Sequence, residues 1–189
     1  MRVLFVTLAL SICVIGTGCG KKASEKLAEK MIEKSIEKDG GKANVDLSSG
    51  KMTISTTDKD GKKYDTTISE NKVTVNSKDG TSTFASGDGA KIPDNFPKDV
   101  HIYSGANILT VMSIPEGFNL TMQTKDNCDK VLGVYKSKMG ANGWKEESSF
   151  NMPPQSMISY KKDTRTANVI VIAEKDSTQI NLTVVTVKQ

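Results

Sequence analysis

The sequence predicts an α+β fold, and three patterns along the chain lead to that prediction. Residues 43–86 form short strand-like segments that turn residues separate at near-regular spacing, as in a β-meander. Residues 24–39 are rich in helix formers and carry their apolar residues on one face. Residues 107–189 contain one helical pattern among strand patterns, in the order ββαββββ. We therefore expect an N-terminal amphipathic helix with a β-meander, then an antiparallel sheet of about six strands packed on one helix.

The first helix is expected over residues 24–39, with Ser24 as its N-cap and Gly40 as its end. Its less polar residues share half of the helical wheel: Leu27, Ala28, Met31, Ile32, Ser35 and Ile36. This stripe has two alternative roles, because it can cover the neighbouring sheet or lie on a membrane surface. The helix has no Trp, Phe or Arg and its polar face is nearly neutral, which favours the sheet.

Residues 24–88 are expected to form one unit of this helix and the meander, and the meander is expected to have one apolar face. Alternation along the strands places these residues together: Val45, Leu47, Met52, Ile54, Tyr64, Ile68, Val73 and Val75. Such a sheet needs a second layer over that face. Residues 58–61, Asp-Lys-Asp-Gly, are similar to the centre of an EF-hand loop, but Thr56 and Thr67 would occupy the positions that need an Asp and a Glu. A hairpin turn is therefore the better interpretation.

Residues 89–106 are rich in Gly and Pro, which predicts a linker and an opening segment with a domain boundary near residue 90. The following domain, residues 107–189, is expected to place strands at 108–114, 118–124, 144–151, 157–161, 167–174 and 179–187.

The helix of this domain is expected to begin with Asp126 as its N-cap and to end at Gly140 or Gly143. Its apolar face, together with the aromatic residue that follows it, is expected to line either the core or a cavity. The residues concerned are Cys128, Leu132, Tyr135, Met139 and Trp144.

The chain begins with a pattern that is typical of an export signal. Arg2 and the amino terminus are positively charged, and residues 3–15 are almost entirely apolar. At about 1.5 Å per residue, this run is too short for a hydrocarbon core of about 30 Å. Residues 1–18 are therefore expected to be a signal peptide.

The end of the leader resembles the lipobox of bacterial lipoproteins. The small residues Gly16, Thr17 and Gly18 precede Cys19, and Gly20 follows it. The resemblance implies that Cys19 receives a diacylglyceryl group and that residues 19–23 form a lipidated tether. Gly20 implies the outer membrane, facing the periplasm, if the cell has two membranes. The alternative is an ordinary secretory signal whose cleavage site precedes a cysteine.

A second resemblance covers residues 92–106 and 135–144. A group of small bacterial lipoproteins of unassigned function carries a segment similar to I-P-x-x-F-P-x-D-V-P-I-Y-P-G-A and a later helix that ends in Gly-Trp. This chain matches both, with His101 and Ser104 in place of two prolines. The resemblance implies an envelope location. The expected topology is also similar to helix-grip and TATA-binding-protein-like domains, which occur in envelope lipoproteins.

Composition and residue types argue against several function classes. Removing residues 1–18 removes Arg2 and no acidic residue, so the net charge falls from +4 to +3, with charges interspersed, which does not indicate nucleic-acid binding. One histidine, His101, and Cys128 cannot form a His/Cys zinc site. His101 lies two residues from Asp99, but the sequence offers no nucleophile setting, phosphate loop or cofactor motif.

We therefore expect a lipid-anchored, non-enzymatic envelope lipoprotein that contacts the membrane through lipid on Cys19 and acts as an interaction or accessory module for an envelope protein. The alternative is a small-molecule or lipid carrier with a cavity between sheet and helix.

Overall fold

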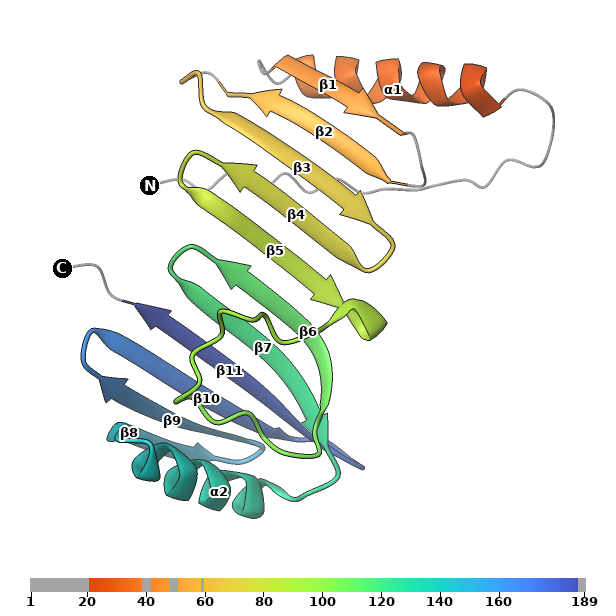
Figure 1. Cartoon of the computed structure of the whole chain (residues 1–189). Coiled ribbons are helices and arrows are strands. Elements are labelled where there is room, and N and C mark those ends of the chain that lie inside the picture. Colours follow the sequence, from red (N-terminus) through yellow and green to blue (C-terminus); the bar gives the residue numbers. More distant parts are fainter. Residues whose placement is uncertain (1–20, 39–41, 48–50, 59, 187–189) are drawn as a thin grey trace.

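The structure is a computed structural model that describes residues 21–38, 42–47, 51–58 and 60–186. The leader, Cys19 and Gly40 lie outside the described residues. Two α-helices and a large antiparallel sheet confirm the expected α+β class (Figure 1). The elements are α1 (Lys21–Lys38), β1 (Lys42–Asp46), β2 (Met52–Thr57), β3 (Lys63–Ser69), β4 (Lys72–Ser77), β5 (Gly80–Ser86), β6 (Asn107–Ile114), β7 (Gly117–Thr124), α2 (Cys128–Ala141), β8 (Lys145–Met152), β9 (Gln155–Lys162), β10 (Arg165–Ala173) and β11 (Thr178–Thr186).

The sheet is larger than the expected six strands because the meander and the C-terminal strands form one sheet. Its eleven strands have the order β1-β2-β3-β4-β5-β6-β7-β11-β10-β9-β8. The two parts join where β5 pairs antiparallel with β6, with Phe84 opposite Met112 and Ala85 opposite Val111. The expected boundary near residue 90 therefore falls between two strands that are paired. Periodicity shows that a strand exists, but it does not show which strand lies beside it.

Helix α1 begins at Lys21, so Ser24 lies inside the helix. The prediction that Ser24 is its N-cap is therefore wrong. The helix lies along the edge strand β1 (Figure 1). Two of its glutamates accept hydrogen bonds from the backbone of β1 and of the residue that follows β1. Glu33 Oε1 accepts from Val45 N at 2.9 Å, and Glu29 Oε1 accepts from Leu47 N at 3.0 Å. Helix α1 therefore covers one open edge of the sheet, where unpaired N–H groups would otherwise face solvent.

Helix α2 begins one residue later than expected. Its N-cap is Asn127, whose side chain accepts a hydrogen bond from Lys130 N, and Asp126 is not the cap. Asp126 instead accepts from Tyr103 OH and pairs with Lys130 Nζ, both at 2.7 Å. The chain leaves the helix through Gly143, whose φ of 82° is a left-handed conformation that glycine tolerates.

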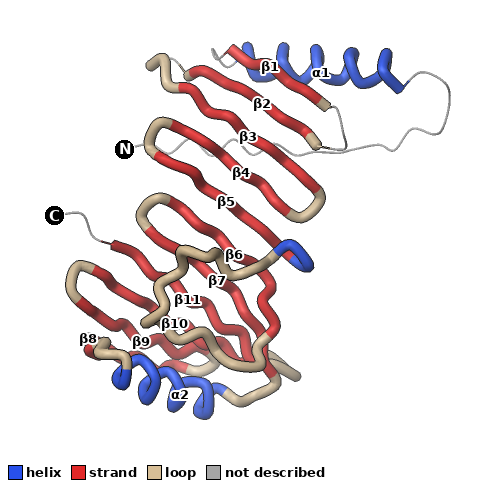
Figure 2. Tube along the Cα trace, viewed as in Figure 1, coloured by secondary structure: helices blue, strands red, loops and turns tan. Residues whose placement is uncertain are grey.

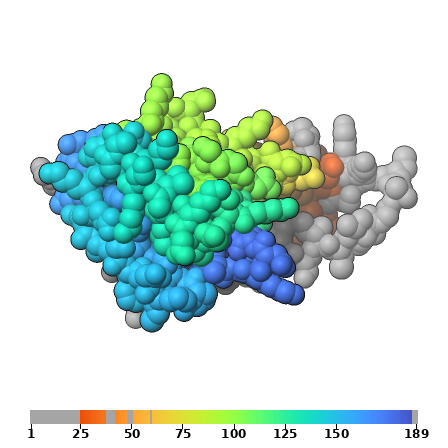
Figure 3. All heavy atoms as spheres, turned by 90° about the horizontal axis from the view of Figure 1, so that it is seen from below, coloured from red at the N-terminus to blue at the C-terminus, as the bar shows by residue number. Residues whose placement is uncertain are grey.

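The segment between β5 and β6 crosses the sheet as a long connection (Figure 2). It begins with a short 3-10 turn, Gly87–Gly89, and its side chains Phe96, Val100 and Tyr103 are buried in the core. Phe96 packs edge-on against Phe118 of β7, with ring centroids 5.2 Å apart. Figure 3 shows this segment and α2 side by side on one surface of the C-terminal part. Together they form the layer that covers β6–β11.

Candidate functional site

The region beneath α2 holds the residues that the sequence assigned to a core or a cavity. Tyr135 and Met139 have no exposed surface, and Trp144 is 3% exposed. Cys128 and Leu132 are partly buried against the same cluster. All five residues belong to the packed core between α2 and the sheet, and Val131 and Leu120 beside them are also fully buried.

Two tyrosine hydroxyls are buried in this core without a hydrogen-bond partner, those of Tyr135 and Tyr160. Burial raises the pKa of Tyr160 to about 12 and raises that of Tyr135 further. Both phenols therefore stay neutral at any physiological pH. Neutral, buried phenols in a filled core are suited to packing.

Asp99 connects the two segments that carried the resemblance to lipoproteins. Its carboxylate accepts a bidentate pair of hydrogen bonds from Arg165, at 2.7 and 2.8 Å, and one from Lys162 Nζ at 2.7 Å. Its backbone oxygen accepts from Trp144 Nε1 at 2.9 Å. The Arg165 guanidinium also lies 5.1 Å from the centre of the Trp144 ring. These contacts therefore hold the connection between β5 and β6 against β9, β10 and the residue that precedes β8.

The same contacts give Asp99 other partners than His101, because its carboxylate binds two cations, Arg165 and Lys162. The Arg165 guanidinium beside it holds the pKa of Asp99 well below its ordinary value of 3.8. His101 donates its backbone N–H to Met139 Sδ at 3.4 Å, and its Nε2 is buried without a partner. Burial lowers the pKa of His101, so the ring is kept neutral. The surroundings of His101 are therefore those of a side chain that packs in the fold.

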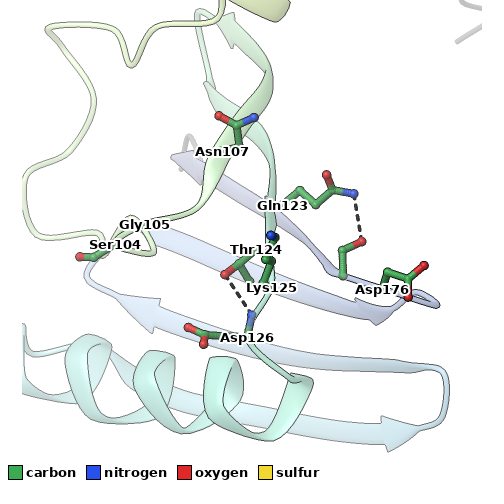
Figure 4. A pocket seen from close by; sticks show the side chains of 9 residues that line it. Ser104, Gly105, Asn107, Gln123, Thr124, Lys125, Asp126 and Asp176 are labelled. Atoms are coloured by element: carbon green, nitrogen blue, oxygen red, sulfur yellow. Dashed lines mark hydrogen bonds between the residues drawn. The ribbon is translucent and has the colours of Figure 1, made fainter.

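A recess at one end of the sheet has a volume of about 590 Å³ (Figure 4). Polar residue types line it, and no pattern in the sequence indicated it. Gln123 Nε2 donates to Ser177 Oγ at 3.1 Å and to Glu174 Oε2 at 3.0 Å, and Thr124 Oγ1 accepts from Asp126 N. The recess is also lined by Asn107 of β6 and by the loop residues Lys125 and Asp176.

The feature with the strongest functional character is a row of apolar side chains on the face of the meander. Directly opposite positions on neighbouring strands lie on the same face of a sheet. The register places five apolar residues opposite one another across β2 to β6: Met52, Ile68, Val73, Phe84 and Met112. Phe84 and Met112 are each 43% exposed, and the other three are partly exposed. We call this set the apolar row.

The apolar row ends where the C-terminal strands begin. From Met112 the same register continues to Asn119 of β7, Thr183 of β11 and Asn168 of β10. Asn119 Nδ2 donates to Thr183 Oγ1 at 2.7 Å, so the face is polar directly beside the row. The buried apolar residues of β6, β7 and β11, such as Val111, Leu120 and Leu182, point to the other face, where α2 and the connection cover them. Farther from the row, β8 to β10 carry apolar side chains on the same face as the row: Phe150, Met152, Met157, Ile170 and Ile172. The buried core of the C-terminal part therefore lies on the opposite face of the sheet from the apolar row.

Neither helix covers the apolar row. Among the described elements, α1 packs against β1, and α2 packs against β8, β9 and β10. A single sheet with a row of exposed apolar side chains lacks the second layer that such a sheet normally has. The sequence correctly indicated one apolar face for the meander, but it predicted that a helix would cover it.

Comparison with protein families matched residues 108–186 to a family model described as START domain-like. The match covers β6 to β11 and α2, less than half of the chain, and it fits the sheet-and-helix arrangement of this part. Comparison with curated proteins and with solved structures gave no match.

The described residues contain no group of three or more His, Cys, Asp or Glu side chains placed to hold a metal ion. In the same part of the chain, no helix combines the length and apolar character that crossing a membrane requires.

Proposed function

We propose that this chain is a lipid-anchored envelope lipoprotein without enzymatic activity, which binds a partner protein through the apolar row of its meander. The partner would supply an apolar surface as the second layer of the sheet. The observation that carries this proposal is the exposure of Phe84 and Met112 at the centre of one sheet, side by side on paired strands. Five strands span about 20 Å, which is wide enough for a protein surface to pack on.

The polar residues beside the row set a boundary for the partner. Asn119, Thr183 and Asn168 continue the row beyond Met112 and would lose hydrogen bonds to water under an apolar partner. A partner that packs on the row would therefore end its apolar contact at β6. Complete burial of the exposed part of Phe84 and Met112 would contribute about 1 kcal/mol each.

The anchor belongs to this proposal and rests on the leader sequence. Mass spectrometry of the mature amino terminus, purified from membranes, is expected to show a diacylglyceryl group on Cys19 with residues 1–18 removed. The control is Cys19→Ala, which cannot accept the lipid and is expected to lack the diacylglyceryl mass. An unmodified Cys19 at the mature terminus would contradict the anchor.

The partner site is tested by photo-crosslinking in intact cells. A photo-reactive amino acid at position 84 or 112 is expected to form one discrete adduct with another protein. The matched control is position 150, because Phe150 is an apolar strand residue with 52% exposure outside the row. The double variant Phe84→Ser and Met112→Ser, with the photo-reactive residue at position 73, is expected to lose the adduct. Equal labelling from positions 84 and 150 would overturn the site.

A second candidate function is a small-molecule or lipid carrier, which the START domain-like match favours. Its ligand would have to enter between α2 and the sheet, where Tyr135 and Met139 have no exposed surface. Native mass spectrometry after gentle extraction separates the two functions. A carrier would retain a ligand of defined mass, whereas we expect the chain to be recovered without one.

A further inference from the structure

Helix α1 has two different faces, and the structure uses only one of them. Its inner face packs along β1 and contains the half-buried side chains of Ala28, Ile32 and Ile36. The same face carries Glu29 and Glu33, whose carboxylates accept the backbone hydrogen bonds of β1 described above. Two acidic side chains of the helix are thereby committed to the edge of the sheet.

The outer face of α1 is apolar and basic. Leu27 is 64% exposed and Met31 is 66% exposed, one helical turn apart. Lys30 and Lys34 follow them by three residues each, a spacing that places neighbours on one side of a helix, and both are exposed. Among residues 25–37, Glu37 is exposed, whereas the other three glutamates are half-buried. Glu29 and Glu33 therefore face the sheet, and Lys30 and Lys34 face away from it. The nearly neutral composition of the helix does not reveal this difference.

We infer that the outer face of α1 lies on the surface of a bilayer that contains anionic phospholipid. Leu27 and Met31 would enter the boundary between headgroups and acyl chains, and Lys30 and Lys34 would contact lipid phosphates. Two apolar side chains are too few for the core of a protein interface, which needs about 800 Å² from each partner. They are sufficient for shallow contact with a membrane, because lysine stems also bury against it while their charges stay in the headgroup region.

The position of α1 in the chain and in the fold agrees with this site. The helix begins at Lys21, two residues after Cys19, so a lipid on Cys19 would hold this face close to the membrane. Helices α1 and α2 lie at opposite ends of the sheet (Figure 1). With ten strand spacings between β1 and β8, the far edge of the C-terminal part would stand about 50 Å from the membrane contact, measured along the sheet. The inference concerns α1 alone and requires neither the lipid nor the partner of the apolar row.

The test measures vesicle binding of the chain from Gly20 onward, which contains every described residue and has no lipid. Co-sedimentation compares vesicles of phosphatidylglycerol and phosphatidylcholine with vesicles of phosphatidylcholine alone. We expect binding at least tenfold stronger to the anionic vesicles, and weaker binding as salt is raised. The double variant Leu27→Glu and Met31→Glu is expected to weaken that binding at least tenfold. Lys30→Gln with Lys34→Gln is expected to weaken it about fivefold.

Two control variants separate the α1 face from general attraction. Lys72→Gln with Lys78→Gln removes two exposed lysines of the meander, and Phe150→Glu with Met152→Glu changes two exposed apolar residues of β8. Both are expected to bind like the unchanged chain, with circular dichroism showing that every variant is folded. Equal binding to the two vesicle types, full binding by the Leu27→Glu and Met31→Glu variant, or an equal loss in the controls would each overturn the inference.

Discussion

Asp99 shows how one side chain can hold together parts of the chain that are far apart in sequence. It binds Arg165 of β10 and Lys162 of β9 through its carboxylate, and Trp144 through its backbone oxygen. Replacing it with Asn would leave Arg165 half-buried with a neutral partner. We expect Asp99→Asn to lower the free energy of unfolding by about 1–3 kcal/mol. Urea denaturation measures this, and Asp94→Asn, an exposed carboxylate of the same segment, serves as the control with little change.

The low pKa of Asp99 also predicts how stability depends on pH. Its hydrogen bonds with Arg165 lower the folded-state pKa below the ordinary value of 3.8, so folding favours the charged carboxylate. The stabilisation is therefore fully present above about pH 4 and is lost as the pH falls through the folded-state pKa. We expect the stability difference between the unchanged chain and Asp99→Asn to shrink below pH 4. A difference that stayed constant from pH 7 to pH 3 would contradict this origin.

Two glycines with different surroundings give a matched prediction. A Cβ added to Gly117 would overlap the backbone oxygen of Val184, because β7 passes close to β11 there. A Cβ added to Gly133, on the exposed side of α2, meets nothing within 4 Å. We expect Gly117→Ala to cost about 3 kcal/mol or to prevent folding, and Gly133→Ala to stabilise by about 0.5–1 kcal/mol. Thermal unfolding of the two variants measures both effects.

At the scale of elements, α1 shows why a helix can be predicted while its role cannot. The sequence indicated a helix near residues 24–39, and the structure places one at Lys21–Lys38. In the prediction from the sequence, the Glu and Lys residues of this helix formed one nearly neutral polar face. The structure turns Glu29 and Glu33 to the backbone of β1 and leaves Leu27 and Met31 outside. This choice depends on the neighbouring edge of the sheet, whose free N–H groups attract carboxylates.

The edge contact predicts local protection of β1. In the double variant Glu29→Ala and Glu33→Ala, the N–H groups of Val45 and Leu47 lose their acceptors. We expect amide hydrogen exchange at both positions to become at least tenfold faster, because loss of a hydrogen bond favours local opening. Glu37→Ala, which changes an exposed glutamate of the same helix, is the control and should leave both rates unchanged. Unchanged exchange in the double variant would show that the glutamates do not protect this edge.

At the scale of the whole molecule, one sheet has two parts that differ in how much apolar surface they bury. The buried core cluster lies between Phe96 and Val184 in the sequence, and Ala90 and Ile92 pack against it. Before residue 90, the described part of the chain has two buried apolar residues, Val45 and Ala85. The meander is therefore a single layer that extends from the edge of a compact unit.

This division predicts different behaviour for two fragments. Residues 90–189 contain the whole core cluster and are expected to fold alone, with a cooperative urea transition. Residues 20–88 lack such a core, so we expect them to stay unfolded without β6 as a template for β5. Circular dichroism and two-dimensional NMR of each fragment test this. A folded meander in isolation would show that its strands are stable without the second unit.

Much of the candidate site follows from local pattern, and the rest does not. Alternation alone placed Met52, Ile68 and Val73 on one face of the meander, and the strand register agrees. Phe84 and Met112 could not be added to them from the sequence, because they belong to segments that a long connection separates. Their pairing depends on β5 meeting β6, which is a tertiary contact. For the same reason, nothing in the sequence near Asp99 indicated Arg165 as its partner.

By itself, the sequence determined the α+β class, the order of strands and helices after residue 107, and the positions of most turns. These features depend on interactions within a few residues, such as alternation, capping and glycine in turns. Only the tertiary structure decided that eleven strands form one sheet, that the buried core lies on the opposite face from the apolar row, and which face of α1 remains outside. These features depend on which edges and faces meet, and that is settled by the free energy of burying apolar surface and pairing backbone groups across the whole chain.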